Sequence, residues 1–495
     1  MMQTIQSIRP FDTPLTRTLI AAALLALTGC AVGPDYQRPE ASLPDSYRAT
    51  QTTPGMQEAM TVEKAWWRRF QDDTLNALVD RALAHNYDLL AAVARVEEAE
   101  GLARQAGATF FPQINLNGSG THNQVSTMNT VPLSSSAPRI QDSRKAGLST
   151  SFEIDLWGKL RRADESARAS LLASRYARDA MELSVAGLVT SSYLSLRAAD
   201  ASLLLTENTL DSRRKTLEIV NNKRQAGSAS PLDQNLAEGS LAVAEAQVAD
   251  LRRQRTLAQN QLALLTGQPN LDIAAGDLRK LPMPPVPPPG LPSALLEARP
   301  DVRQAEETLV SYNAQIGVAK AALFPSLSLT GNYGGESAAL SNLFKSGANV
   351  WSIGLAATMP LFDFGRNAAL IDQAKAKQQQ ALIAYQKAIE SAFKDVKDAL
   401  VNLSEYAESD RAQEKRVQIA GRTLELAQIR YEAGYVGFLD VLDAQRSSND
   451  ALLAYISTRQ ARLNSTVDLF KALGGGWRDE YKPETPVAMD ASTPK

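Results

Sequence analysis

Two stretches of the chain place apolar or small residues at alternating spacings of three and four. They span residues 158–226 and 365–433, are 69 residues long each, and contain no proline. An α-helix of that length would reach roughly 100 Å, far more than a typical globular or bilayer-spanning helix. The seam positions are Val185, Val189, Ser192, Leu196, Ala199, Leu203, Leu210, Leu217 and Val220 in the first stretch, and Leu382, Tyr385, Ile389, Ala392, Val396, Ala399, Leu403, Tyr406, Val417, Ala420, Leu424, Ala427 and Tyr431 in the second. This heptad seam predicts coiled-coil packing of two long helices.

Shorter segments alternate polar and apolar residues and predict β-strands. Within 350–362, one face carries Trp351, Ile353 and Leu355, whereas the residues between them are small or polar. The four predicted strands lie at about 113–126, 145–157, 326–337 and 350–362. Such alternation is typical of a membrane β-barrel strand, although an ordinary soluble hairpin fits it as well.

Four strands are too few to close a barrel, and an open sheet edge cannot face lipid. Either the strands lie outside the membrane or several chains share one barrel. Three copies would supply twelve strands, which is within the range that leaves a water-filled lumen.

The chain contains an internal repeat. The segment 224–233 matches 431–440 at an offset of 207 residues. Upstream, Phe111-Pro112 matches Phe324-Pro325 at an offset of 213. Because the offset changes by six residues, we expect a longer loop in the first copy. Each copy reads as helix, strand, strand, very long helix, turn, helix.

The repeat and its flanks divide the chain into six parts. They are a signal peptide (1–29), a lipidated extended segment with a first helix (30–85), a first copy (86–267) that ends in a return helix at 233–265, a proline-rich linker (268–298), a second copy (299–474) that ends in a return helix at 440–473, and a C-terminal tail (475–495). The prolines of the linker exclude a helix there and favour an extended strap.

The N-terminus has the pattern of a targeting signal. Arg9 and Arg17 precede an apolar run from Leu19 to Leu27 that is too short to span a bilayer. The run is followed by Thr28, Gly29 and Cys30, which is the only cysteine of the chain. Its surroundings resemble the bacterial lipoprotein cleavage box, which implies a covalent lipid on Cys30. A chance cysteine after a signal peptide is the alternative.

Composition excludes several classes of function. The net charge of −2 is far from the basic balance of a nucleic-acid-binding protein. One cysteine and two histidines, His85 and His122, leave little material for a disulfide framework or a metal site. Asp363-Phe-Gly365 matches a kinase tripeptide, but no glycine-rich loop or catalytic-loop motif accompanies it. We therefore predict no enzyme activity, no metal and no cofactor other than the lipid.

These motifs together resemble the outer-membrane efflux protein family, which is TolC-like, and most closely its lipoprotein branch typified by OprM. The resemblance rests on the cleavage box, Trp66-Trp67 with Phe70, the duplicated unit, the Phe-Pro before each first strand, and the two tips. It implies an α+β membrane protein: a homotrimeric, twelve-stranded β-barrel in the outer membrane with four strands per chain. A long α-helical coiled-coil barrel continues it into the periplasm. The implied partners are outer-membrane lipid, a periplasmic adaptor (membrane fusion) protein and an inner-membrane transporter of the RND type.

The segment between the second long helix and its return helix is the candidate gate. Asp440 and Asp443 resemble the acidic ring of the family and Tyr431 its tyrosine brace, while Leu439, Asp443 and Arg446 resemble the gate of the lipoprotein branch. In the first copy, Leu236 stands where the second has Asp443. Three-fold rings of carboxylates would attract cations and raise each other's pKa. Helix capping is the competing role for both aspartates.

The two tips are the predicted adaptor-docking surface. Their small and polar residues suit docking of one tip against another, although simple solvated turns have the same composition; the residues are Gly227, Ser228, Asp233, Gly434 and Gly437. We predict a passive exit duct for antibiotics and other toxic organic molecules. Protein secretion, metal-ion efflux, and a non-conducting structural lipoprotein of the envelope remain as alternatives.

Overall fold

The computed structural model describes residues 31–40, 62–126, 128, 138–286, 298–478 and 481. Cys30, the predicted signal peptide, most of the tail predicted at 475–495 and part of the linker predicted at 268–298 lie outside these residues. The chain divides into two compact units: residues 1–39, 98–171 and 307–383 form the first, and residues 40–97, 172–306 and 384–495 form the second.

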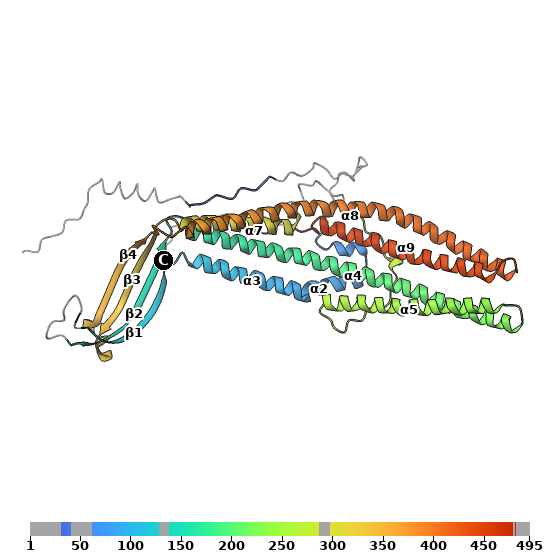
Figure 1. The fold of residues 1–495 in the computed structure, drawn as a ribbon, viewed down its shortest axis with the longest axis horizontal. Helices are drawn as coiled ribbons and strands as arrows, with labels where there is room; N and C mark the ends of the chain where they lie inside the picture. The colour runs from blue at the N-terminus through green and yellow to red at the C-terminus, as the bar shows by residue number, and fades with distance from the viewer. Residues whose placement is uncertain are drawn as a thin grey trace, which may run out of the picture. The chain divides into compact units, whose positions relative to one another are not determined.

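Each half of the chain contains a helix, two strands, a very long helix and a return helix in that order, together with further short helices that differ between the halves. In chain order these are η1 (Trp66–Phe70), α2 (Asp73–His85), α3 (Tyr87–Ala108), β1 (Gln113–Gln124), β2 (Ile140–Ile154), α4 (Lys159–Gln225), α5 (Pro231–Leu265), η2 (Leu278–Lys280), α7 (Pro300–Ala321), β3 (Ser326–Ser337), η4 (Leu340–Asn342), η5 (Ser346–Ala348), β4 (Asn349–Thr358), α8 (Arg366–Glu432) and α9 (Phe438–Ala472). Helices α3 and α7 have 22 residues each, α4 and α8 have 67, and α5 and α9 have 35. Figure 1 shows α5 returning along α4 and α9 returning along α8.

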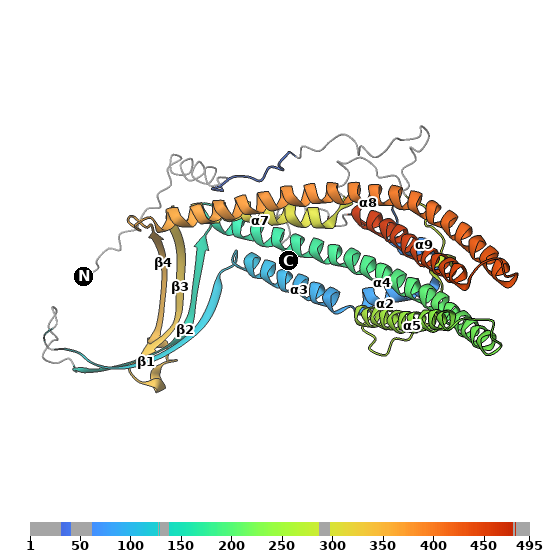
Figure 2. The ribbon, with the colours of Figure 1, turned by 45° about the vertical axis from the view of Figure 1, so that its right-hand side comes forward.

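The strands form one antiparallel sheet in the order β1-β2-β3-β4 (Figures 1 and 2). Strand β2 pairs with β1 and, across the boundary between the two halves, with β3, where Ile154 lies opposite Leu327. Strands β1 and β4 are therefore the two edges of the sheet.

Several predicted strand boundaries differ from those of the structure. Strand β2 begins at Ile140 rather than at 145, because its first residues pair with the end of β1, where Gln124 lies opposite Ile140. Strand β4 ends at Thr358 rather than at 362, since Pro360 has no N–H to donate to a ladder. Strands β1 and β2 also end earlier than predicted, at Gln124 and Ile154.

The predicted helix boundaries shift by one or two residues. The long helices are Lys159–Gln225 and Arg366–Glu432. The return helices begin two residues earlier than predicted, at Pro231 and Phe438. A proline such as Pro231 is well tolerated in the first turn of a helix. Among the described residues, no helix combines the length and the apolarity that crossing a membrane requires.

The core of the second unit is organised around Trp66. This side chain is fully buried, stacks on Phe470 of α9 at 5.3 Å between ring centroids, and meets Phe70 edge-on at 6.5 Å. The heptad seam contributes to the same core through Val189 and Leu196, which are also fully buried. Amphipathic packing against this core therefore supports the middle of α4.

A buried ionic network fixes α4 to three other segments. The Asp200 carboxylate, whose side chain is 1% exposed, accepts hydrogen bonds from Arg197 at 3.1 Å, from Arg255 of α5 at 2.6 Å and from the Gly276 N–H at 2.9 Å. The Tyr193 hydroxyl donates to Asp72 at 2.6 Å. Burial raises the pKa of Tyr193 and the hydrogen bond to Asp72 raises it further, so the hydroxyl remains a donor.

Candidate functional site

The β-sheet has one polar and one apolar face. Residues that lie opposite each other in the register share a face. The rows of the polar face include Asn115, Ser149, Asn332 and Ser352, with Gln113, Ser151 and Thr330. On the apolar face, one row consists of Leu116, Leu148, Tyr333 and Trp351. Neighbouring rows of the same face contain Phe152, Leu329 and Leu355, and Ile114 and Ile353.

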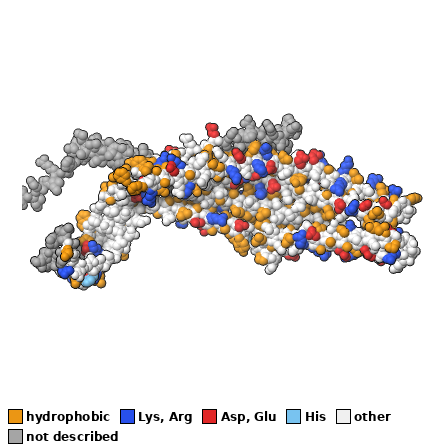
Figure 3. All heavy atoms as spheres, viewed as in Figure 1, with side chains coloured by type: hydrophobic (Ala, Val, Ile, Leu, Met, Phe, Trp, Pro, Cys, Tyr) orange, Lys and Arg blue, Asp and Glu red, His pale blue; other side chains and the backbone are white. Residues whose placement is uncertain are grey.

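Hydrogen bonds within the polar face hold its side chains in rows. The Asn117 amide donates to Ser149 at 2.5 Å, and the Asn332 amide donates to Ser352 at 3.2 Å. On the opposite face, Trp351 and Ile353 are 72% and 75% exposed. In Figure 3 the part of the sheet in view is mostly white, the colour of backbone and uncharged polar side chains. Such a sheet can separate water on one side from an apolar medium on the other.

Both helical tips turn on a glycine with left-handed backbone geometry. Gly227 follows α4 with φ 73°, and Gly434 follows α8 with φ 78°. The Ser228 N–H donates to the Lys223 carbonyl and the Tyr435 N–H to the Arg430 carbonyl, at 2.8 Å in each case. These bonds satisfy carbonyl groups that the helix ends would leave unpaired. Any other residue at either glycine would strain the turn.

An aspartate caps the return helix at each tip. Asp233 accepts from the Ser230 N–H at 3.0 Å while its own N–H donates to Ser230 Oγ at 3.1 Å, which is a capping box. Asp440 accepts from the Gly437 N–H, also at 3.0 Å. The capping role that competes with gating is therefore present at Asp440, and it does not exclude a second role.

Three further residues of the predicted gate, Leu439, Asp443 and Arg446, lie on the exposed side of α9. Asp443 and Arg446 form an ion pair at 3.3 Å, and their side chains are 63% and 74% exposed. Leu439 is 56% exposed. The structure thus brings the Asp443 and Arg446 side chains together within one helix, and it leaves Asp440 paired with backbone.

The two tips are joined by an apolar cluster that the sequence did not reveal. Phe438, 4% exposed, packs with Val220 of α4 and Ala237 of α5. Its ring lies 5.7 Å from the ring of Tyr431, between centroids. The Lys223 ammonium lies 4.4 Å from the centre of the Tyr431 ring, within cation–π range. Tyr431 is therefore a brace between the tips, and no spacing in the sequence pairs it with Lys223.

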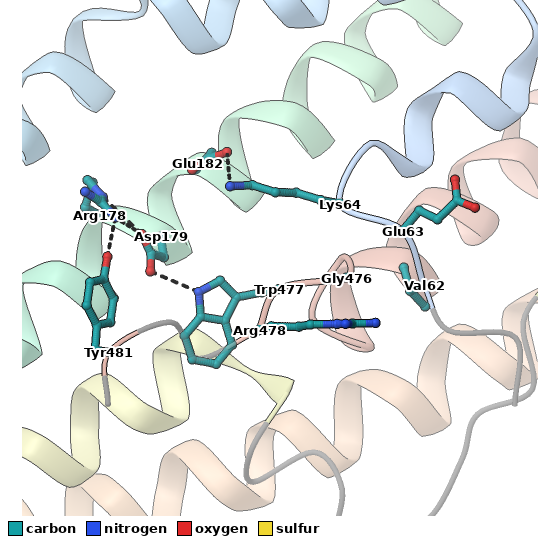
Figure 4. A pocket seen from close by; sticks show the side chains of 10 residues that line it. All are labelled: Val62, Glu63, Lys64, Arg178, Asp179, Glu182, Gly476, Trp477, Arg478 and Tyr481. Atoms are coloured by element: carbon teal, nitrogen blue, oxygen red, sulfur yellow. Dashed lines mark hydrogen bonds and ion pairs between the residues drawn. The ribbon is translucent and has the colours of Figure 1, made fainter. Parts of the chain in front are cut away.

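A polar pocket of about 310 Å³ lies where the C-terminal segment meets α4 (Figure 4). Trp477 donates to Asp179 at 2.9 Å, and Asp179 also pairs with Arg178 at 2.6 Å. Lys64 lies 3.6 Å from Glu182. Because most of its charges are paired, we interpret the pocket as an anchor for the C-terminal segment. No three potential ligands gather as a metal site in the part of the chain that the structure describes.

Comparisons with known proteins agree with this geometry. The profile of the family "Outer membrane efflux protein" matches residues 78–268 and 291–475, close to the two predicted copies. The cation efflux system protein CusC of Escherichia coli is 34% identical over 461 residues, covering 92% of this chain and 97% of CusC. The toluene efflux pump outer membrane protein TtgI of Pseudomonas putida is 34% identical over 471 residues, covering 93% and 98%.

A solved structure shares the fold over nearly the whole chain. The outer membrane channel CmeC of Campylobacter jejuni superimposes with a TM-score of 0.85 at 27% identity, covering 92% of this chain and 96% of CmeC. A two-faced sheet with paired long helices that turn at glycine tips therefore defines a TolC-like outer-membrane channel.

The chain belongs to the outer membrane efflux protein family. Its resemblance to that family, its location in the outer membrane and its lack of an enzymatic role are thereby confirmed, because the family consists of transport channels.

Replacing Phe438 with alanine should loosen both tips. The substitution removes the phenyl ring that is buried against Val220 and Ala237 and leaves a cavity there. Such truncations lower the free energy of unfolding by about 3–5 kcal/mol in a core. We expect faster amide hydrogen exchange in residues 217–225 and 431–442, with no change around Val189.

Leu439→Ala is the matched control, because Leu439 is the next residue in the chain but its side chain is exposed. Its truncation should lower the free energy of unfolding by less than about 0.5 kcal/mol. Equal exchange rates in the two variants would contradict the role of Phe438.

Proposed function

We propose that the chain is the exit duct of a tripartite efflux pump. It conducts small toxic organic molecules passively from a periplasmic adaptor and an inner-membrane transporter of the RND type to the outside. The observation that carries this proposal is the two-faced sheet, with Asn332 and Ser352 on the water side and Trp351 and Ile353 on the lipid side. A passive duct needs only a continuous polar path, because the pump supplies the energy.

The proposed duct is a homotrimer. One sheet of four strands has two open edges, and backbone groups on an open edge are costly in lipid. Three copies supply a closed ring of twelve strands, which is wide enough for water. The helices would continue this ring as a coiled-coil barrel, and their exposed apolar residues would face neighbouring copies; examples are Leu188, Leu204, Val401 and Ile419.

In this assembly the second tip is the periplasmic gate. Around a three-fold axis, Asp440 and Asp443 of each copy form rings of negative charge that hold cations and repel one another. Arg446, which already lies 3.3 Å from Asp443, balances part of that charge in the closed state. The tips, with Gly227 and Gly434 at their turns, are the docking surface for the adaptor.

The lipid anchor on Cys30 is supported by the segment that follows it. The Val32 N–H donates to the Trp157 carbonyl at 2.9 Å, where β2 leads into α4. A side chain at Gly158 would come within 2.7 Å of Ala31 Cβ, so the two backbones are in close contact. The residues that follow the proposed lipid site therefore lie beside the end of β2, as an anchor close to the sheet requires.

Deleting the gene should sensitise cells to the exported molecules. We expect increased susceptibility to solvents such as toluene and to antibiotics, reversed by the intact gene. Susceptibility confined to copper or silver salts would favour the metal-ion alternative, to which the resemblance to CusC also points. Loss of a secreted protein, without a change in susceptibility, would favour protein secretion and contradict small-molecule efflux.

Purified protein in planar bilayers should conduct, and removing the gate acids should enlarge the conductance. For Asp440→Ala combined with Asp443→Ala, we expect higher single-channel conductance and weaker block by divalent cations, because the proposed charge rings are lost.

Asp233→Ala is the control, since Asp233 caps its helix with the same 3.0 Å bond that Asp440 makes. Unchanged conductance in the double variant would contradict the gate, and absence of any conductance in the parent would support a purely structural lipoprotein.

A further inference from the structure

The two strand-to-helix junctions of the chain correspond to each other through the repeat. Trp157 follows β2 and Phe364 follows β4, 207 residues later. Phe111 precedes β1 and Phe324 precedes β3, 213 residues later. Each half thus carries an aromatic residue at the matching position before its first strand and another at the matching position after its second strand.

Within the chain, the aromatic residue after β2 packs on the one before β3. The ring of Trp157 stacks on that of Phe324 with 4.7 Å between centroids and 26° between planes. The Trp157 indole N–H donates to the Pro325 carbonyl at 2.7 Å. This contact closes the end of the β2–β3 pair, and so it joins the two halves of the chain.

The corresponding contact of the other two aromatic residues is missing within one chain. Phe364 is 104% exposed and Phe111 is 67% exposed, and neither makes a ring contact with any residue that the structure describes. They stand next to β4 and β1, the two edges of the sheet. Only another copy of the chain can bring a β1 edge to this β4 edge.

The surroundings of Phe364 also favour a covered surface. Leu361 and Phe362 are 79% and 91% exposed, and Figure 3 shows hydrophobic side chains gathered where β4 leads into α8. Phe364 itself has φ 52°, a left-handed geometry that bulky residues rarely adopt. Trp157 does not have this left-handed geometry. The junction after β2 and the junction after β4 therefore differ in local backbone conformation, although β2 and β4 occupy matching positions in the two halves.

We propose that neighbouring copies join β4 to β1 in the register that the chain uses between β2 and β3, with Phe364 of one copy stacked on Phe111 of the next. This inference rests on the homotrimer proposed above and specifies its interface. Thr150 of β2 lies opposite Gly331 of β3. Ala357 corresponds to Thr150 at the offset of 207, and Gly118 corresponds to Gly331 at the offset of 213. We therefore predict that Ala357 lies opposite Gly118 of the next copy.

The predicted register keeps the faces of the sheet consistent. Thr150 and Gly331 lie in the same row as Ile114 and Ile353, which belong to the apolar face. Ala357 lies two residues after Leu355, and Gly118 two residues after Leu116, so both also belong to that face. A shift by one residue would turn one strand over and place apolar side chains in the polar row.

Cysteine pairs test the register in the full-length protein. Ala357→Cys with Gly118→Cys should form disulfide-linked dimers and trimers on mild oxidation, because directly opposite residues can meet the geometry of a disulfide. Space around Gly118 is open, so the new side chain should be tolerated. Thr150→Cys with Gly331→Cys is the positive control and should link within one chain.

Two further variants set the baseline. Ala357→Cys with Leu116→Cys shifts the pair by two residues and should link less than a tenth as much, since diagonal neighbours lie about 7–8 Å apart. The parent chain, whose only cysteine is Cys30, should give no linked species.

The aromatic contact has its own test. Phe364→Ser should lower the temperature at which the assembled protein separates into single chains. Phe362→Ser should lower it much less, because Phe362 is also exposed but its counterpart in the first half is Asp155 and not an aromatic residue.

Trimers that form normally but link only through the shifted pair would overturn the proposed register while leaving the duct intact. Equal effects of the two serine variants would overturn the stacking. A protein that remains a single chain in detergent and in lipid would instead overturn the trimer of the proposed function.

Discussion

The need to pair every backbone group at a sheet edge constrains the whole molecule. Hydrocarbon offers no hydrogen-bond partner, so an open edge in a membrane is costly. One chain provides four strands with β1 and β4 as edges, and its two halves are already joined through β2 and β3. In the proposed trimer, joining the remaining edges between copies would repeat a pairing that the chain makes internally, and this would turn a single sheet into the wall of a duct.

The repeat predicted from the sequence agrees with the order of the elements in the two halves, and in the proposed duct its departures from symmetry distinguish the roles of the two tips. Helices of equal length in the two halves allow both to extend the same tube. The tips differ: both have a capping aspartate, but only the second adds Asp443 and Arg446. Phe438 of the second tip is buried against the first, so movement of one tip requires the other to yield. In the proposed gate, this contact would keep the tips closed until a partner supplies binding energy.

Much of the fold was predictable from the sequence because its periodic patterns are long. The heptad seam located α4 and α8, and Tyr385, Val396 and Val189 are buried as it predicts. The start of β2 was not predictable, since residues 141–144 are polar on both faces and only pairing with β1 makes them a strand. The Asp200 network and the contact of Lys223 with Tyr431 join residues far apart in the chain, and no local spacing records such partners. The sequence predicted a capping role for Asp440, and the structure identifies the backbone group that it caps as the Gly437 N–H.

The central claim is that the polar face of the sheet lines a path of water through the outer membrane. Reaction of single cysteines with a charged, membrane-impermeant thiol reagent tests it directly, with Asn332→Cys on the polar face and Ile353→Cys on the apolar face. We predict rapid reaction at 332, with a fall in single-channel conductance, and protection at 353 in lipid. Rapid reaction at 353 with protection at 332 would contradict it.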